Sequence, residues 1–389
     1  MSTDVVMNEI EKCIETKNVE QALELCSKEK QYYLGLFIGR LLQTTSSRYF
    51  ELMAIMTSNT DVTKADVKLL KNQEPSVVQT DDPTKIRVQL LCNWCPSEEL
   101  ARMWNKMSKG NYIWNNIQIV WDGRIDYYVV INSSPSGIPI DKKKTILFRM
   151  EPNMAKNPEI WKEWANPNQE DFLKVFKHES GDYNNNEWHL SKTYTELLNT
   201  SVPKNPELTK VLSTVLSAQY NDIGHVKRVD FVKFLDKKGV TVHVFGDNKW
   251  QYKNYKGSLP THCKDDGIFP YKYTFNAENN PINNYFTEKL IDGILGECLT
   301  FYWGCPNAKK YIDERAYVQL ELSNFEQDYE TIKRAIQEDW HSQRLPYIKE
   351  AKKKILTELQ FFPRLEQILN VIQNQKKDEA KELGKKEVV

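Results

Sequence analysis

The sequence lacks the features that would direct it to a membrane or to a polyanion. Its 53 basic and 53 acidic residues cancel, so no net field attracts nucleic acid or anionic lipid, and any anion site must be local. The longest strongly apolar run, Tyr32–Gly39, is far shorter than the roughly 20 residues that cross a bilayer. The N-terminus shows no signal-peptide pattern. We therefore expect a cytoplasmic protein without a transmembrane segment and without a nucleic-acid partner.

Several common catalytic motifs are missing as well. With only 15 glycines, the chain contains no G-x-G-x-x-G, no G-x-S-x-G and no phosphate-binding loop, which argues against ordinary dehydrogenases, hydrolases and nucleotidases. No Asp-x-Asp triplet is present to hold a metal-bound nucleotide sugar. The seven cysteines are scattered and odd in number, which indicates reduced thiols. The isolated Cys92-x-x-Cys95 pair is better explained as the end of a strand than as a metal site.

What is present is a chain of 389 residues, 40% of them hydrophobic, which is enough for more than one globular domain. Apolar residues recur at helical spacing near the N-terminus, and a polar, proline-containing stretch follows. From Ile86 onward, short apolar runs alternate with helical segments, a pattern typical of α/β layers. The expected segments are a helical appendage (1–75), a linker (76–85), two Rossmann-like α/β domains (86–205 and 206–345), and C-terminal helices with a charged tail (346–389).

The alternation of apolar and polar residues, together with residue composition, predicts the positions of strands and helices. Strands are predicted within residues 86–94, 117–121, 126–133, 145–151, 240–246, 271–279 and 299–304. Helices are predicted at 97–107 with Ser97 as N-cap, at 226–239 with Gly239 as the stop, and at 286–295 with Asn284 or Thr287 as N-cap. The C-terminal helices should be interrupted at Pro346 and Pro363, and the tail from Lys376 should be frayed.

Ligands of open parallel sheets bind beyond the carboxyl ends of the strands, so the residues that follow each strand are the site candidates. Glu151 follows one strand and precedes a proline, although a solvated loop glutamate is the simpler reading of any single Glu. Glu288 and Lys289 open a helix, where free N–H groups favour an anion; Glu288 could equally just complement the helix dipole. Arg228 alone would be read as a surface arginine.

A family resemblance suggests roles for these residues. The stretch from Tyr271 to Ile312 resembles the signature region of glycosyltransferase family 10, the α-1,3-fucosyltransferases; it reads YKYTFNAENNPINNYFTEKLIDGILGECLTFYWGCPNAKKYI. The preceding VTVHVFGDNKW and HVKRVDFVKFL, and TILFRMEPN in the first domain, are similar to further family segments. Four positions depart from the family pattern: Met150, Ala277, Asn280 and Asn284 stand where Gly, Phe, Ser and Asp are usual.

The resemblance implies a GT-B fold, in which two Rossmann-like domains face a cleft, and transfer of fucose from GDP-fucose with inversion at the anomeric carbon. It implies no obligatory cofactor or metal, although a divalent ion would be compatible. By resemblance Glu151 is the general base, Arg228 and Lys289 bind the diphosphate, and Glu288 contacts the ribose. The remaining donor-binding candidates are Gly246, Glu278, Asn279 and Tyr285.

The expected partners are a nucleotide sugar and an acceptor glycan, and the N-terminal helices could support self-association or a protein partner. Two alternatives stay open at this point. One is a GT-B transferase that uses another nucleotide sugar; the other is a catalytically silent glycan-binding or scaffold protein of the same fold. The sequence does not identify the acceptor, because the resemblance is weakest in residues 152–171.

Overall fold

The computed structural model describes residues 82–386, apart from 136, 184–186 and 261. The chain divides into two compact units, Met1–Gln79 and Thr80–Val389, and everything below concerns the second. The expected helical appendage (1–75) and most of the expected linker lie outside the described residues. Among the helices that the structure describes, none is long and apolar enough to cross a membrane.

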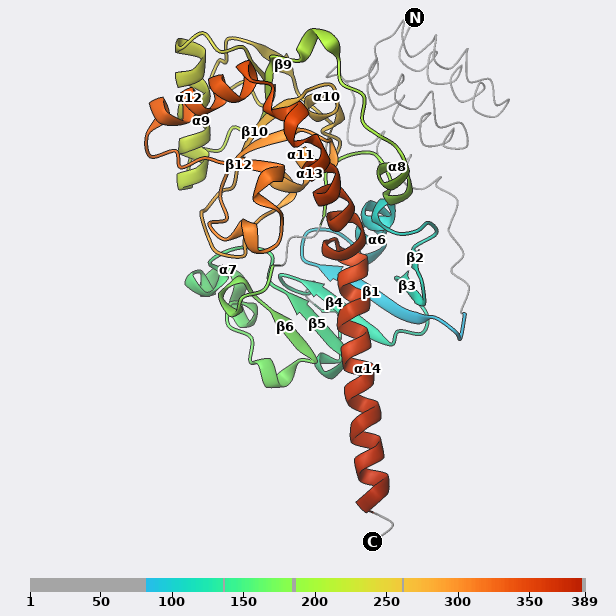
Figure 1. The fold of residues 1–389 in the computed structure, drawn as a ribbon. Coiled ribbons are helices and arrows are strands. Elements are labelled where there is room, and N and C mark those ends of the chain that lie inside the picture. Colours follow the sequence, from blue (N-terminus) through green and yellow to red (C-terminus); the bar gives the residue numbers. More distant parts are fainter. Residues whose placement is uncertain (1–81, 136, 184–186, 261, 387–389) are drawn as a thin grey trace, which may run out of the picture. The chain divides into compact units, whose positions relative to one another are not determined.

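The first lobe is built on a six-stranded sheet of order β2-β3-β1-β4-β5-β6 (Figure 1). All neighbours are parallel except β2 and β3. The parallel strands follow a flavodoxin-like doubly wound order, whose direction reverses between β1 and β4. The strands are β1 Ile86–Cys92, β2 Ile113–Trp114, β3 Ile117–Val120, β4 Tyr127–Ile131, β5 Thr145–Phe148 and β6 Lys174–Phe176.

Helix α6 (Ser97–Trp104) follows β1 and buries Leu100, Ala101 and Trp104 in the apolar core of this lobe. The prediction that Ser97 is the N-cap was wrong. Pro96 occupies that position, with φ −59° and ψ 151°, and Ser97 is the first helical residue. Proline already holds the extended backbone that precedes a helix, so the helix starts one residue earlier than expected. Two other short helices of this region are α7 (Pro158–Trp161) and α8 (Tyr194–Asn199).

The second lobe contains a six-stranded, fully parallel sheet of order β12-β11-β10-β7-β8-β9. This is the Rossmann order, and its direction reverses between β7 and β10. The strands are β7 Leu212–Leu216, β8 Val242–Gly246, β9 Tyr255–Gly257, β10 Tyr273–Ala277, β11 Leu299–Trp303 and β12 Tyr317–Gln319. The connections contain α9 (Ile223–Lys237), α10 (Asp265–Ile268) and α11 (Glu288–Leu295).

The C-terminal part consists of α12 (Phe325–Gln337), α13 (Trp340–Lys354), a five-residue π-helical turn (Ile355–Leu359) and α14 (Phe361–Lys386). The prediction that Pro346 interrupts a helix was wrong. Pro346 lies inside α13 on its exposed side, where the lost hydrogen bond faces solvent, and α13 continues past it. Helix α14 extends to Lys386, and fraying of the tail from Lys376 stays a prediction. Pro363 falls in the first turn of α14, where its missing N–H is tolerated.

Helix α14 returns the chain from the second lobe to the first (Figure 1). The ring of Phe361 lies 4.7 Å from that of Trp104, and Phe362 stacks at 5.8 Å on Trp114. The indole N–H of Trp114 also donates to Glu366 at 3.0 Å. Aromatic burial of this kind contributes several kcal/mol, so α14 completes the core of the first lobe.

The loops at the carboxyl ends of the two sheets contact each other. His178, just after β6, has its ring between the carbonyl oxygen of Met150, after β5, and that of Asn284, after β10. Two Rossmann-like lobes with their strand ends turned toward each other form the GT-B architecture that the sequence predicted.

Candidate active site

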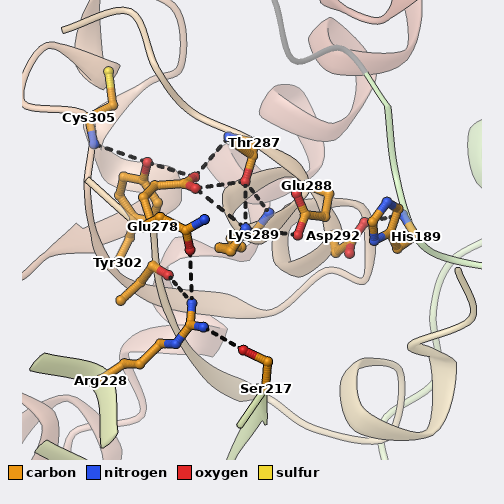
Figure 2. A network of polar contacts seen from close by, with 12 residues as sticks. His189, Ser217, Arg228, Glu278, Thr287, Glu288, Lys289, Asp292, Tyr302 and Cys305 are labelled. Carbon is orange, nitrogen blue, oxygen red and sulfur yellow. Dashed lines mark hydrogen bonds and ion pairs between the residues drawn. The ribbon is translucent and has the colours of Figure 1, made fainter. Parts of the chain in front are cut away.

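Arg228 lies at the carboxyl ends of the neighbouring strands β7 and β10, between which the strand order reverses. Doubly wound sheets bind their ligands at such a switch point. Helix α9 carries it, and its side chain points toward the strand ends (Figure 2). Its Nη2 donates to the Ser217 hydroxyl group after β7 at 2.9 Å. Its Nη1 donates to the side chain of Asn279 at 3.3 Å and to the Ala277 carbonyl at 3.4 Å, at the end of β10. The arginine predicted to bind diphosphate is therefore fixed at this point and only 5% exposed.

Two buried donors at this place have no acceptor among the described residues: the Nε of Arg228 and the hydroxyl group of Tyr252. Burial lowers the pKa of Arg228, an effect that Glu278 and Glu288 oppose. Burial raises the pKa of Tyr252 to about 12, although the charge of Arg228 acts in the opposite direction. The phenol therefore keeps its proton at neutral pH. An unsatisfied buried donor costs about 1–3 kcal/mol, so each one calls for an explanation such as a water molecule, an ion or a bound ligand.

Glu278 fixes the start of helix α11 through hydrogen bonds, and its side chain is fully buried. Its carboxylate accepts hydrogen bonds from the Thr287 N–H (2.8 Å), the Thr287 hydroxyl group (2.7 Å) and the Tyr302 hydroxyl group (3.1 Å), as Figure 2 shows. Thr287 is the N-cap, one of the two caps that the sequence allowed. A Cβ on Gly304 would lie 2.3 Å from Glu278 Cγ, so a glycine is needed there. Glu278 thus positions the helix start, and its contact with the donor stays a prediction.

Lys289 is the accessible cation of this helix start, with 22% of its side chain exposed. Its Nζ lies 3.0 Å from Glu288 Oε1, 3.3 Å from the Thr287 hydroxyl group and 3.7 Å from Glu278 Oε2. All three partners belong to the same short stretch, so the ammonium group is preplaced beside the N–H groups of α11. A cation at the positive end of a helix dipole favours a phosphate.

Glu288 is shared between two lysines. Its Oε1 atom also accepts from Lys264 Nζ at 3.2 Å, and Lys264 pairs with the buried Asp292 at 3.1 Å. Burial alone would raise the pKa of Glu288, but the charges of Lys264 and Lys289 outweigh it and hold that pKa well below its usual range. Glu288 is therefore an anion at neutral pH, and Lys264 balances part of the charge that Lys289 would otherwise neutralise alone.

The other donor-side candidates surround these groups. Asn279 is half-buried beside Arg228, and Tyr285 is buried with its ring 5.2 Å from that of His178. Gly246 ends β8 with φ +99°, and a Cβ there would lie 2.2 Å from the Leu216 carbonyl oxygen. At Gly224 on α9, a Cβ would come within 1.8 Å of the Glu278 carbonyl oxygen. Both glycines let neighbouring backbones approach closely at the switch point.

Glu151 comes from the first lobe, three residues after β5 ends. The Asn132 side chain accepts the N–H groups of Met150 (2.7 Å) and Glu151 (2.9 Å), which fixes the backbone at this point. The residue is solvent-accessible, yet protein atoms around the carboxyl group displace enough water to raise its pKa. Lys289 opposes this shift, whereas Glu288 adds to it, and both belong to the second lobe. The carboxylate thus lies within electrostatic reach of the donor-side groups.

Sequence reasoning missed Ser217, Tyr252 and Lys264. Ser217 directly follows β7, which the sequence analysis did not predict as a strand, so the strand-end rule did not reach it. Tyr252 and Lys264 lie in irregular segments that give no periodic signal. His225, left unassigned, serves α9 by forming a capping box with Asp222. In the part of the chain that the structure describes, no group of three or more His, Cys, Asp or Glu could hold a metal ion.

Comparison with known proteins confirms the resemblance over the second lobe. Residues 206–339 match the family model described as glycosyltransferase family 10 (fucosyltransferase) C-term, and this segment contains every donor-side candidate from Arg228 to Lys289. An alpha-(1,3)-fucosyltransferase FucT of Helicobacter pylori is 30% identical over 71 residues, which cover 18% of this chain and 15% of that protein. The match therefore spans a small part of the curated relative.

Solved structures with similar coordinates include an alpha1,3-fucosyltransferase, with a TM-score of 0.46 and 16% identity, covering 70% of this chain and 84% of that one. An alpha-glucosyltransferase in complex with UDP and DNA has a TM-score of 0.49 and 10% identity, covering 74% of this chain and 100% of that one.

Proposed function

We propose that this protein is an inverting glycosyltransferase that moves fucose from GDP-fucose to a hydroxyl group of an acceptor glycan. The observation that carries the proposal is the pair of fixed cations, Arg228 and Lys289, together with the Arg228 Nε and the Tyr252 hydroxyl group, which have no acceptor among the described residues. The family match over residues 206–339 supports the choice of donor, since GDP and GDP-fucose are bound in solved alpha1,3-fucosyltransferases.

On the donor side, the diphosphate would lie between Arg228 and the start of α11. When the bond from the anomeric carbon to the β-phosphate oxygen breaks, its electron pair stays on that oxygen, and negative charge grows on the departing GDP. Cations and N–H groups already in place stabilise that charge more in the transition state than in the ground state. Glu278 would act through Thr287 by holding the helix start, and Tyr252 would donate its unpaired hydroxyl group to the donor.

On the acceptor side, Glu151 would take the proton of the attacking hydroxyl group. The acceptor oxygen forms its bond to the anomeric carbon from the face opposite the leaving diphosphate, which inverts the configuration. The raised pKa of Glu151 suits this role, because a stronger base accepts the proton more readily. A positioned base of this kind contributes roughly 10²–10⁴-fold.

The proposal is tested by incubating the protein with GDP-fucose and a glycan array and identifying the products by mass spectrometry. A parallel thermal-shift panel compares GDP, UDP and ADP, since only a bound nucleotide stabilises the fold. We expect GDP to stabilise and a fucosylated glycan to form. Stabilisation by UDP or ADP alone would indicate a transferase with another donor, as the unusual Ala277 and Asn280 would allow. Absence of any nucleotide effect would favour the silent glycan-binding protein.

A further inference from the structure

We propose that His178 is a positioning residue that couples the backbone bearing the proposed base, Glu151, to the donor loop, which we define as residues 278–287. His178 is 4% exposed and follows β6 in the first lobe. Its role deepens the proposed function and rests on it, but the coupling itself can be measured independently of activity.

The geometry that supports this role is the placement of both ring nitrogens. Nε2 lies 3.2 Å from the carbonyl oxygen of Met150, the residue directly before Glu151. Nδ1 lies 3.1 Å from the carbonyl oxygen of Asn284, the residue directly before Tyr285. A single imidazole therefore spans from the base segment of one lobe to the donor loop of the other. A neutral ring can donate to one of these carbonyls, and a protonated ring can donate to both.

Two further contacts fasten the same histidine to the donor loop. The Asn284 side-chain amide donates to the His178 carbonyl oxygen at 2.8 Å. The edge of one ring meets the face of the other between His178 and Tyr285, with centroids 5.2 Å apart and an interplanar angle of 83°. The donor loop thus contacts the histidine through backbone, side chain and ring.

The donor loop also has partners of its own within the second lobe. The Asn307 side chain accepts the Asn284 N–H at 2.8 Å, and the Tyr311 hydroxyl group donates to the Asn284 side chain at 2.6 Å. Asn284 has a φ of 66°, a left-handed conformation that asparagine tolerates. Arg228 and Lys289 are likewise held by partners within the second lobe. Loss of the imidazole should therefore loosen the link between Met150 and Asn284 without dismantling the diphosphate site.

The consequence concerns transfer and not donor binding. A base displaced by about 1 Å from its acceptor can cost on the order of 10²-fold in rate. Attack by water, which needs no positioned acceptor, should suffer less. Without His178, a larger share of the donor should be hydrolysed instead of transferred.

The test uses the full chain with His178→Phe, which keeps the aromatic ring and removes both nitrogens, and His178→Gln, which restores one donor. The matched control is His341→Phe. His341 is also buried, 3% exposed, has its Nε2 atom 2.8 Å from the Glu297 carbonyl oxygen, and packs against a tyrosine ring within the second lobe. Readouts are GDP affinity by calorimetry, the ratio of transfer to donor hydrolysis, and amide hydrogen exchange.

For His178→Phe we expect kcat for transfer to fall at least 10-fold, GDP affinity to stay within twofold, and amide hydrogen exchange to rise both at Met150 and Glu151 and at residues 284–287. The kcat of His178→Gln for transfer should lie between the values for His178→Phe and the wild type. His341→Phe should leave the transfer-to-hydrolysis ratio unchanged. The inference would be overturned if His178→Phe transferred fucose at the wild-type rate, or if it lost kcat and GDP affinity equally. If the wild-type protein shows no turnover of GDP-fucose, the proposed function fails, while unchanged exchange at either segment still refutes the coupling.

Discussion

At the level of single residues, Arg228 and Tyr252 each retain a buried donor that no described residue accepts. Folding leaves such groups unpaired at a cost, so they are informative where they cluster. Arg228 lies at the strand ends that the Rossmann order marks as a ligand site, and Tyr252 is near enough to interact with it electrostatically. The combination points to an anionic or hydroxyl-rich ligand more strongly than charge alone, because surface lysines and arginines are common.

The hydroxyl group of Tyr252 gives a direct test. Tyr252→Phe removes one oxygen that has no partner among the described residues, so the free energy of unfolding should stay unchanged or rise. If the hydroxyl group binds the donor, GDP-fucose affinity should drop roughly 10-fold, the equivalent of about 1.4 kcal/mol. Chemical denaturation and calorimetry measure the two effects. A variant that loses stability and keeps full donor affinity would show that the hydroxyl group serves the fold.

Glu151 provides a second residue-scale prediction. Glu151→Gln keeps the shape of the side chain but cannot take a proton, so transfer should fall by roughly 10²–10⁴-fold while GDP binding is retained. In the wild type, the carboxylate must be ionised to act, and its pKa lies above the ordinary value. Activity should therefore decline as the pH falls through that raised pKa, at a higher pH than for an ordinary glutamate. A pH–rate profile without this acidic limb, or full activity of the variant, would contradict the assignment.

At the scale of elements, close backbone approaches hold α9 against the donor loop. Gly224→Ala would place a Cβ 1.8 Å from the Glu278 carbonyl oxygen, so the helix or the loop must move. Overpacking of this kind costs about 1–3 kcal/mol. We expect a lower melting temperature together with weaker GDP binding. Lys237→Ala, at the exposed end of the same helix, is the control and should change neither. Normal GDP affinity in Gly224→Ala would show that this contact does not shape the site.

Helix α14 offers a test of how the C-terminal part stabilises the first lobe. Phe361 is 1% exposed and packs against Trp104, so Phe361→Ala should cost about 3–5 kcal/mol in unfolding free energy. Val371, on the same helix and 57% exposed, is the matched control, and Val371→Ala should change stability by less than about 0.5 kcal/mol. Equal effects in denaturant titrations would mean that α14 does not contribute to the core.

The elements also show what the sequence could predict. Short segments such as Ile86–Cys92 and Leu299–Trp303 were predicted as strands, and most of their residues are buried on both faces of the sheet. Edge strands of two or three residues, β2, β6, β9 and β12, are too short to produce a periodic pattern and were not predicted. The prediction at Pro346 failed because a proline on the exposed side of a helix loses only a solvent-facing hydrogen bond.

At the scale of the whole molecule, the candidate site draws on both lobes, and this juxtaposition is what the sequence could not supply. Strand-end position and family resemblance together identified Glu151, Arg228 and Lys289. No local pattern indicates that His178 reaches Asn284 across 106 positions of sequence, or that Lys264 shares Glu288 with Lys289. Such contacts depend on how the two sheets face each other, which is a property of the tertiary fold.

The central claim is that a diphosphate binds between Arg228 and Lys289, and a crystal structure with bound GDP tests it most directly. We predict phosphate oxygens within hydrogen-bonding distance of the Arg228 Nε and of Lys289 Nζ, with the lysine turned away from Glu288 and toward the ligand. GDP bound elsewhere, with Arg228 Nε still unpaired and Lys289 still on Glu288, would contradict the account.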